Sequence, residues 1–322
     1  MDVSPSSTNP VPADRRTGLT VFGILQILLG LCAAGLVLVV AAGHEFAEQS
    51  GGAPSEAALA SAVVVYGLAA AYFITVGVGS IRCRRWARAL TVVASALWMA
   101  AGVVGGLMIA VVMPRVAAAQ GMANRAMGTG CVAIGVLVLG IVLPLVLFLF
   151  YRRADVRLTC ERIDGKSRWT DRVPLPVLAV ILVLAFGAVA LIANLASPRF
   201  TILGREVTGA TAAITLFALA GLCGVLAVQL YRLKESAWWT LILLQLAGVG
   251  IAITTLMRTE PSKLAPAGTP AEVAAIYRDP LFLAILAATW IAYFAFLVYL
   301  RRFFIPRHAP RTRLADQSRF SE

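Results

Sequence analysis

Long uncharged stretches alternate with short charged segments along the whole chain. The eight longest runs without Asp, Glu, Lys, Arg or His are 17–43, 57–81, 89–114, 126–151, 173–198, 207–231, 236–257 and 280–300, each 21 to 27 residues long. A helix rises about 1.5 Å per residue, so about 20 apolar residues cross a hydrocarbon core about 30 Å thick. A helix also satisfies its own backbone hydrogen bonds, which lipid cannot do. The pattern therefore predicts an all-α integral membrane protein with eight transmembrane helices.

The lysine and arginine residues are distributed unevenly between the two sides of these predicted spans. With the N-terminus inside, the inner segments hold 21 of them and the outer loops hold 7, which together make the 28 in the chain. Cytoplasmic loops carry an excess of Lys and Arg, so the split predicts that both termini are cytoplasmic. Trp86, Trp169, Trp238 and Trp239 fall near the predicted cytoplasmic boundary, where amphipathic rings favour the interface.

The composition agrees with a membrane protein and changes the interpretation of the charge. The chain is 60% hydrophobic and 14% charged, with a mean hydropathy of +0.84, whereas soluble domains are about 25% charged. The net charge of +12 is explained by topology and by contact with anionic lipid head groups on the cytoplasmic side. We therefore expect the lipid bilayer as a partner and expect no binding of nucleic acid.

Similar segments about 150 residues apart suggest two halves. SIRCRRWARALTVV (80–93) follows the second run as QLYRLKESAWWTLIL (229–243) follows the sixth, and FLFYRR (148–153) ends the fourth as FLVYLRR (296–302) ends the eighth. Four spans is an even number, so the halves would be parallel repeats; the general likeness of apolar helices is the alternative. The predicted organisation is a disordered cytoplasmic N-terminus (1–16), a four-helix half (17–151), a basic cytoplasmic linker (152–172), a second four-helix half (173–303) and a basic cytoplasmic tail (304–322).

The linker carries the pattern of a short amphipathic helix. Val156, Cys160 and Ile163 recur at helical spacing while charged residues take another face, and Gly165 can end the helix. One interpretation is a solvated linker that faces lipid head groups, and the other is a docking site for a cytoplasmic protein. The candidate contact surface consists of Arg153, Arg157, Arg162, Arg168 and Trp169.

Few side chains in the chain could perform chemistry. The five cysteines lack paired spacing, and the two histidines, His44 and His308, lie outside the uncharged runs. A buried haem would need paired axial histidines, and a zinc protease would need HExxH. We therefore predict no enzymatic activity, no cofactor and no metal site.

Uncharged polar residues within the runs are the remaining candidates for a site. They are Gln26, Gln245, Asn194, Tyr66 and Tyr293. Hydrogen bonding between helices is one role for them, and binding of a neutral or lipidic ligand is the other. Gln26 and Gln245 lie at similar predicted depth, so we expect them to approach each other across the bundle.

Small residues and one proline predict how some helices pack. Gly30 and Ala34, like Gly102 and Gly106, are four residues apart, a spacing that lets helices approach closely. Pro144 lies within the fourth run, where it is expected to kink the helix.

The segments RCRRWARALTVV (82–93) and FYRRADVRLTCERIDGKSRWTDRVPLPVL (150–178) resemble those of uncharacterised multi-pass bacterial inner-membrane proteins, in which an Arg-rich turn ending in Trp-Ala-Arg joins two spans. The resemblance covers about a tenth of the chain. It implies a location in the bacterial cytoplasmic membrane and implies no activity. We expect a non-enzymatic protein with a structural, regulatory or accessory role; the alternative is a permease or flippase-like carrier of a neutral or lipidic solute, with its site between the two halves.

Overall fold

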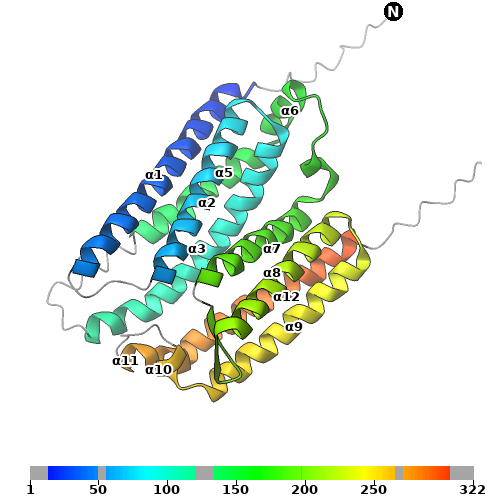
Figure 1. The fold of residues 1–322 in the computed structure, drawn as a ribbon. Helices are drawn as coiled ribbons and strands as arrows, with labels where there is room; N and C mark the ends of the chain where they lie inside the picture. Colours follow the sequence, from blue (N-terminus) through cyan, green and yellow to red (C-terminus); the bar gives the residue numbers. More distant parts are fainter. Residues whose placement is uncertain (1–13, 50–55, 120–133, 197, 265–270, 305–322) are drawn as a thin grey trace, which may run out of the picture.

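The computed structural model describes residues 14–49, 56–119, 134–196, 198–264 and 271–304. Within these ranges, eight helical segments are long and apolar enough to cross a membrane, which confirms the predicted all-α membrane class (Figure 1). Their helices are α1 (Arg16–Gln49), α2 (Glu56–Ile81), α3 (Arg85–Ala119), α5 (Leu143–Arg152), α7 (Leu175–Ala193), α8 (Gly209–Tyr231), α9 (Glu235–Arg258) and α12 (Pro280–Leu300). Large apolar side chains such as Leu38, Ile214 and Met257 are exposed, as expected of helices surrounded by lipid.

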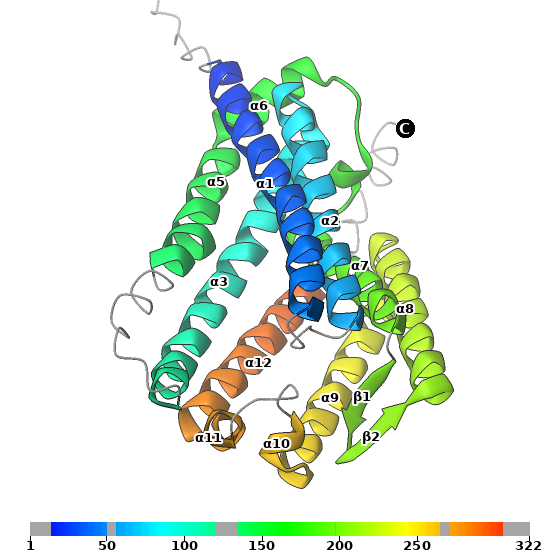
Figure 2. The ribbon, with the colours of Figure 1, turned by 60° about the vertical axis from the view of Figure 1, so that its left-hand side comes forward.

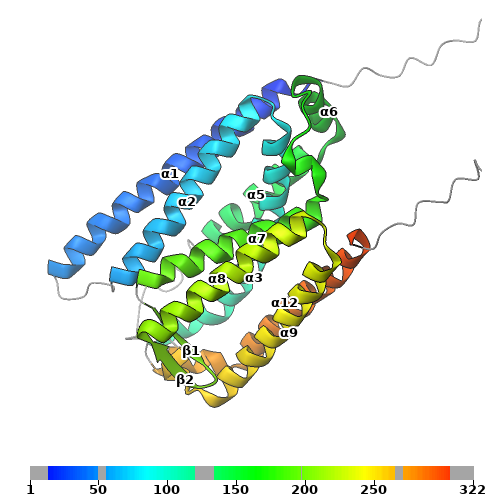
Figure 3. The same cartoon turned by 45° about the vertical axis from the view of Figure 1, so that its right-hand side comes forward.

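Shorter elements connect the spans and divide the molecule into two ends. They are η1 (Val138–Val142), α6 (Ala154–Ile163), η2 (Trp169–Arg172), η3 (Asn194–Ala196), β1 (Arg199–Ile202), β2 (Arg205–Thr208), α10 (Pro261–Leu264), α11 (Ala271–Ala274), η4 (Ala275–Arg278) and η5 (Arg301–Phe303). The start of α1, the turn at 82–84, α6, the turn at 232–234 and the end of α12 share one end, which we name the basic end (Figures 1 and 3). The hairpin of β1 and β2, α10 and α11 lie at the other end.

Helices α1 and α2 cross closely because glycines line their contact. A Cβ atom built on Gly77 would lie 2.7 Å from the carbonyl oxygen of Gly23, and one on Gly23 would lie 2.8 Å from that of Gly77. Further along, a Cβ on Gly30 would lie 3.0 Å from the carbonyl oxygen of Ala70. The small residues that meet are therefore seven apart on each helix, whereas the sequence suggested a spacing of four.

Helix α3 joins the first four spans to the last four. It contacts α2 and α5 on one side and α7 and α12 on the other, and Figure 2 shows it between α5 and α12. Leu178 of α7 is fully buried in a cluster with Val76 of α2 and Val93 of α3. Packed apolar side chains thus fill this contact between the first four spans and the last four.

A π-helical turn lies within the fourth span, just before Pro144. Proline has no backbone N–H to donate to the carbonyl four residues earlier, Gly140, and the chain here adopts the π-helix η1. A Cβ built on Gly102 of α3 would collide with the backbone of Gly140. The sequence predicted a kink at Pro144, and the structure has a π-helix just before it that lies directly against α3.

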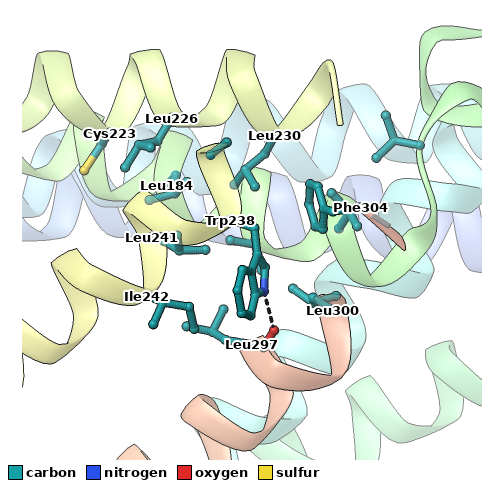
Figure 4. Packing of buried hydrophobic residues seen from close by; sticks show 14 residues of the cluster. Leu184, Cys223, Leu226, Leu230, Trp238, Leu241, Ile242, Leu297, Leu300 and Phe304 are labelled. Carbon is teal, nitrogen blue, oxygen red and sulfur yellow. Dashed lines mark hydrogen bonds between the residues drawn. The ribbon is translucent and has the colours of Figure 1, made fainter. Parts of the chain in front are cut away.

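The last spans are held together around Trp238 of α9 (Figure 4). Its indole Nε1–H donates to the backbone oxygen of Leu297 on α12 at 2.8 Å, near a helix end where the N–H of Arg301 bonds to Val298 instead. Trp238 is 5% exposed, whereas the sequence placed it at the membrane interface. Burial of the ring against Leu241 and the hydrogen bond of its polar edge both favour the inward orientation.

A β-hairpin between α7 and α8 is an element that the sequence analysis did not predict. Strands β1 and β2 pair antiparallel, and the two turn residues Leu203 and Gly204 both have positive φ angles, +53° and +81°, typical of a type I′ hairpin. The backbone N–H of Leu203 donates to the Thr255 hydroxyl of α9 at 2.9 Å. This bond fixes the hairpin to the end of the bundle opposite the basic end.

We predict that Gly77→Ala destabilises the protein by about 1–3 kcal/mol, because the added methyl group would overpack against the α1 backbone. Gly67→Ala in the same helix is the matched control, since a Cβ there meets nothing within 4 Å. Reversible unfolding in mixed detergent micelles measures both. Equal stability of the two variants would contradict the glycine contact.

Candidate functional site

The side chain of Gln26 lies in a buried polar cluster where α1, α2 and α3 meet. Its amide Nε2 donates to the hydroxyl of Thr91 at 3.2 Å, and the hydroxyl of Ser80 donates to its Oε1 at 3.2 Å. All three residues are at most 3% exposed. Both ends of the amide are therefore used to connect three helices, which is the role of hydrogen bonding between spans.

The expected approach of Gln26 to Gln245 is wrong. Gln245 is on α9, which lies away from α1 in Figures 1 and 3, and its buried Nε2 has no hydrogen-bond partner among the described residues. Asn194, at the end of α7, donates to the carbonyl oxygen of Ala190 in that helix at 2.8 Å. Tyr66 is half-buried on α2, and Tyr293, a residue of α12, packs against the apolar cluster around Trp238. The five polar candidates thus lie on separate elements, because similar depth in a membrane does not determine lateral position.

The linker helix α6 is docked on the basic end of the bundle. Val156 and Cys160 are 0% and 1% exposed and belong to a cluster with Leu19, Leu147 and Tyr151. The predicted amphipathic helix is confirmed, and this part of its apolar face contacts helix ends of the protein itself. Ile163, the third residue of the predicted apolar face, is exposed.

The carboxylate of Asp164, directly after α6, holds the linker to the turn between α2 and α3. Arg168 donates to it from two nitrogens at 3.0 and 3.2 Å, and Arg84 donates at 3.2 Å. The backbone N–H of Arg85, at the start of α3, donates at 3.3 Å. The Asp164 side chain is only 2% exposed, so these charge-assisted bonds compensate for its burial.

Three further contacts extend this attachment to other helix ends. They are Arg15 Nη2 to Asp155 Oδ2 at 3.4 Å, Arg85 Nη2 to the Glu161 carbonyl oxygen at 3.1 Å, and Arg88 Nε to the Tyr151 carbonyl oxygen at 3.2 Å. We name α6, Asp164 and these partners the linker clasp. It joins the start of α1, the turn at 82–84 and the end of α5.

Of the predicted contact surface, one residue is held inside the clasp and the others are exposed. Arg168 is half-buried in the clasp and is occupied by Asp164. Arg153 and Arg162 are exposed, as is Arg157, which pairs with Glu161 on the same helix at 2.7 Å. Trp169 is also exposed (44%). The docked linker therefore exposes three guanidinium groups and one indole, and we name these exposed side chains its outward face.

Electrostatics in the clasp favour structure over reactivity. The hydrogen bonds from Arg168 hold the pKa of the Asp164 carboxyl below its ordinary value. Burial raises the pKa of the Cys160 thiol to about 12 and also raises the pKa of Cys83. Both thiols stay protonated at neutral pH, whereas nucleophiles and metal ligands need the thiolate. Within the described residues, no group of three or more His, Cys, Asp and Glu side chains could hold a metal ion.

The part that Asp164 plays was not predicted from the sequence. The charged residues of the linker were placed on one face of the helix without a partner, although a signal was present. Four arginines lie within 82–88 and the first linker acid beyond the helix is Asp164, so charge complementarity between the two segments could have indicated the contact.

We predict that Asp164→Asn destabilises the protein by about 1–3 kcal/mol, because an amide of the same shape cannot balance the arginines that converge on it. Glu161→Gln is the matched control, since its exposed pair with Arg157 contributes less than about 1 kcal/mol. Thermal unfolding in detergent gives the stability. Maleimide labelling of Cys160, in a background without the other cysteines, should accelerate in Asp164→Asn. Unchanged stability and unchanged labelling would show that the carboxylate does not hold the linker.

The same carboxylate gives a pH dependence with a definite sign. Its pKa is lowered by folding from the unfolded value of about 3.9, so its contribution is complete above that value and is lost as the pH falls through the folded pKa. We expect the stability difference between wild type and Asp164→Asn to be constant above about pH 5 and to shrink below about pH 4. Melting curves across this range measure it. A difference that does not change with pH would contradict the assignment.

Similarity to known proteins does not indicate a function for the chain. Comparison of the chain with protein-family models, curated proteins and solved structures finds no match. The features that bear on function are therefore the clasp, the buried polar cluster and the surface of the basic end.

Proposed function

We propose that the chain is a non-enzymatic accessory protein of the bacterial cytoplasmic membrane, with a structural or regulatory role and the linker as its contact surface. The observation that carries this proposal is the outward face of the docked helix α6. Arg153, Arg157 and Arg162 are exposed on it or at its start, and Trp169 is exposed further along the linker, which Asp164 holds to the bundle. A cytoplasmic protein and anionic lipid head groups are the proposed partners of this face.

The proposed orientation places the basic end in the cytoplasm, with both termini on that side. In support, the segments that gather at the basic end are those that carry most of the Lys and Arg residues of the chain. An excess of positive charge on cytoplasmic segments is the general rule for multi-pass proteins.

We also propose that the first and last four spans are repeats of one four-helix unit. The turn between α2 and α3 and the turn between α8 and α9 have the same hydrogen bonds 150 positions apart: Arg84 N–H to Gly79 O, and Lys234 N–H to Gln229 O. The central residue of each turn has a positive φ angle, +50° at Cys83 and +53° at Leu233. Two left-handed non-glycine residues at matched positions support a common origin of the units.

The packing of the bundle favours an accessory role over transport. Leu178 of α7 is fully buried against Val76 and Val93 of the first four spans. The deep amide of Gln26 is fully engaged by Ser80 and Thr91. A carrier with a site between the halves needs polar groups that a solute can reach.

A permease or flippase-like carrier of a neutral or lipidic solute is the second candidate function. The observation in its favour is Gln245, whose buried amide nitrogen on α9 has no hydrogen-bond partner among the described residues. A buried donor without a partner costs about 1–3 kcal/mol, and a polar solute could satisfy it.

Reconstitution into vesicles distinguishes the two functions. For an accessory protein, we expect fluorescent phospholipids to cross the bilayer at the protein-free rate, as measured by dithionite quenching. Accelerated crossing that is lost in Gln245→Leu would favour the carrier and contradict our proposal. Gln26→Leu serves as a control for general loss of fold, because Gln26 is buried among helices.

Photo-crosslinking in cells tests the proposed contact surface. A photoreactive residue at Arg157 should give a discrete protein adduct, and one at Ile214, exposed on α8, should give none. A reporter fused at Arg162 should give a cytoplasmic signal. A periplasmic signal there would overturn the proposed orientation.

A further inference from the structure

Two open pockets lie at the basic end, and neither is part of the linker's outward face or of the buried polar cluster. The first has a volume of about 500 Å³ and lies beside the end of α2, the turn at 82–84 and Arg168 of the linker. The second has a volume of about 530 Å³ and lies beside the end of α8 and the turn at 232–234. Each pocket is therefore at the boundary where a predicted span leaves the membrane.

The two pockets are formed by matched positions of the chain. Residues 74, 75, 78, 79, 82 and 84 line the first pocket, and the residues 150 positions later, 224, 225, 228, 229, 232 and 234, line the second. The left-handed turns at Cys83 and Leu233 place a basic residue on each side of the turn in both cases. The same fold of the chain thus creates the same kind of pocket twice.

Each pocket has basic side chains in one part of its wall and mainly apolar side chains in the other. Arg82 in the first pocket, and Arg232 and Lys234 in the second, are exposed and form no ion pair within the described residues. Below these cations, on the membrane side, the lining is mainly apolar, with Val78 in the first pocket and Val228 in the second, and each pocket has one uncharged polar side chain, Thr75 or Gln229. A ligand that fits both parts has an anionic head and a hydrocarbon chain.

We infer that each pocket binds the head group of an anionic phospholipid, with the phosphate between the two basic residues and an acyl chain along the apolar floor. A free phosphate ion could use the cations but would leave the floor exposed, which is why the lipid is the better match. This inference rests on the membrane placement proposed above and is independent of the choice between accessory protein and carrier.

The first pocket should bind more tightly than the second. Its wall has the guanidinium groups of Arg82, Arg84 and Arg168 against one carboxylate, that of Asp164, with which Arg84 and Arg168 pair. The indole of Trp86 forms a side of the pocket. That indole packs against Gly79, where an added Cβ would lie 2.9 Å from the ring. At the position that matches Arg85, the second unit has Glu235 at the start of α9, which lowers the local positive charge.

Native mass spectrometry of the purified full chain with phosphatidylglycerol or phosphatidylcholine tests the inference. We expect the wild type to retain phosphatidylglycerol preferentially. Arg82→Gln should weaken binding at the first pocket about fivefold, since each cation near the lipid surface contributes about that factor. Arg232→Gln combined with Lys234→Gln should remove the weaker bound lipid. The triple variant should show no preference for the anionic lipid.

Lys166→Gln is the matched control, because Lys166 is exposed in the linker at the same end, lines neither pocket and is outside the proposed contact surface. Equal loss of lipid in Lys166→Gln and Arg82→Gln would overturn the inference in favour of a diffuse surface charge. Displacement of the lipid by inorganic phosphate alone would overturn the choice of lipid in favour of a phosphate site. Unchanged melting temperatures would show that the variants remain folded. Transport measured in vesicles is a separate readout, so failure of the accessory role would leave this result standing.

Discussion

The buried carboxylate of Asp164 is the interaction on which the arrangement of the basic end depends. The linker and the start of α3 with the turn before it both carry several arginines, and without a counter-charge they would repel each other where they meet. Asp164 accepts hydrogen bonds from Arg84, Arg168 and the backbone of Arg85. One acidic side chain thereby fixes both the position of the linker and the turn that precedes α3, a helix of the first four spans that contacts α7 and α12 of the last four.

The parts of the fold that are decided by solvent could be predicted from the sequence. A span must be a long uncharged helix in lipid, so the eight spans were evident, and the period of Val156 and Cys160 was sufficient to place α6 because one face of that helix is buried. The approach of Gln26 to Gln245 could not be predicted correctly. Lipid gives every apolar helix face a favourable environment, so hydropathy carries almost no information about which helices become neighbours.

Close contacts between backbones were the second part that hydropathy did not determine. Gly30 was recognised as a packing residue, but its partner surface on α2 and the contact between Gly102 and Gly140 depend on how helices cross. The hairpin at β1 and β2 was missed because its four-residue strands lie next to a long apolar run. The pockets at the basic end were missed for a related reason, since the positive charge there was attributed to topology and to general contact with lipid head groups, which gives no positions for individual side chains.

The hydrogen bond between Trp238 and Leu297 has a consequence for the order in which the protein is completed. Helix α9 enters the membrane before α12 because synthesis proceeds from the N-terminus. Until α12 arrives, the indole N–H of Trp238 lacks the carbonyl that it binds in the finished structure, and an unpaired donor in an apolar environment is costly. The last span therefore completes α9 as well as the bundle, so a chain truncated before α12 would retain an exposed defect that membrane quality control can recognise.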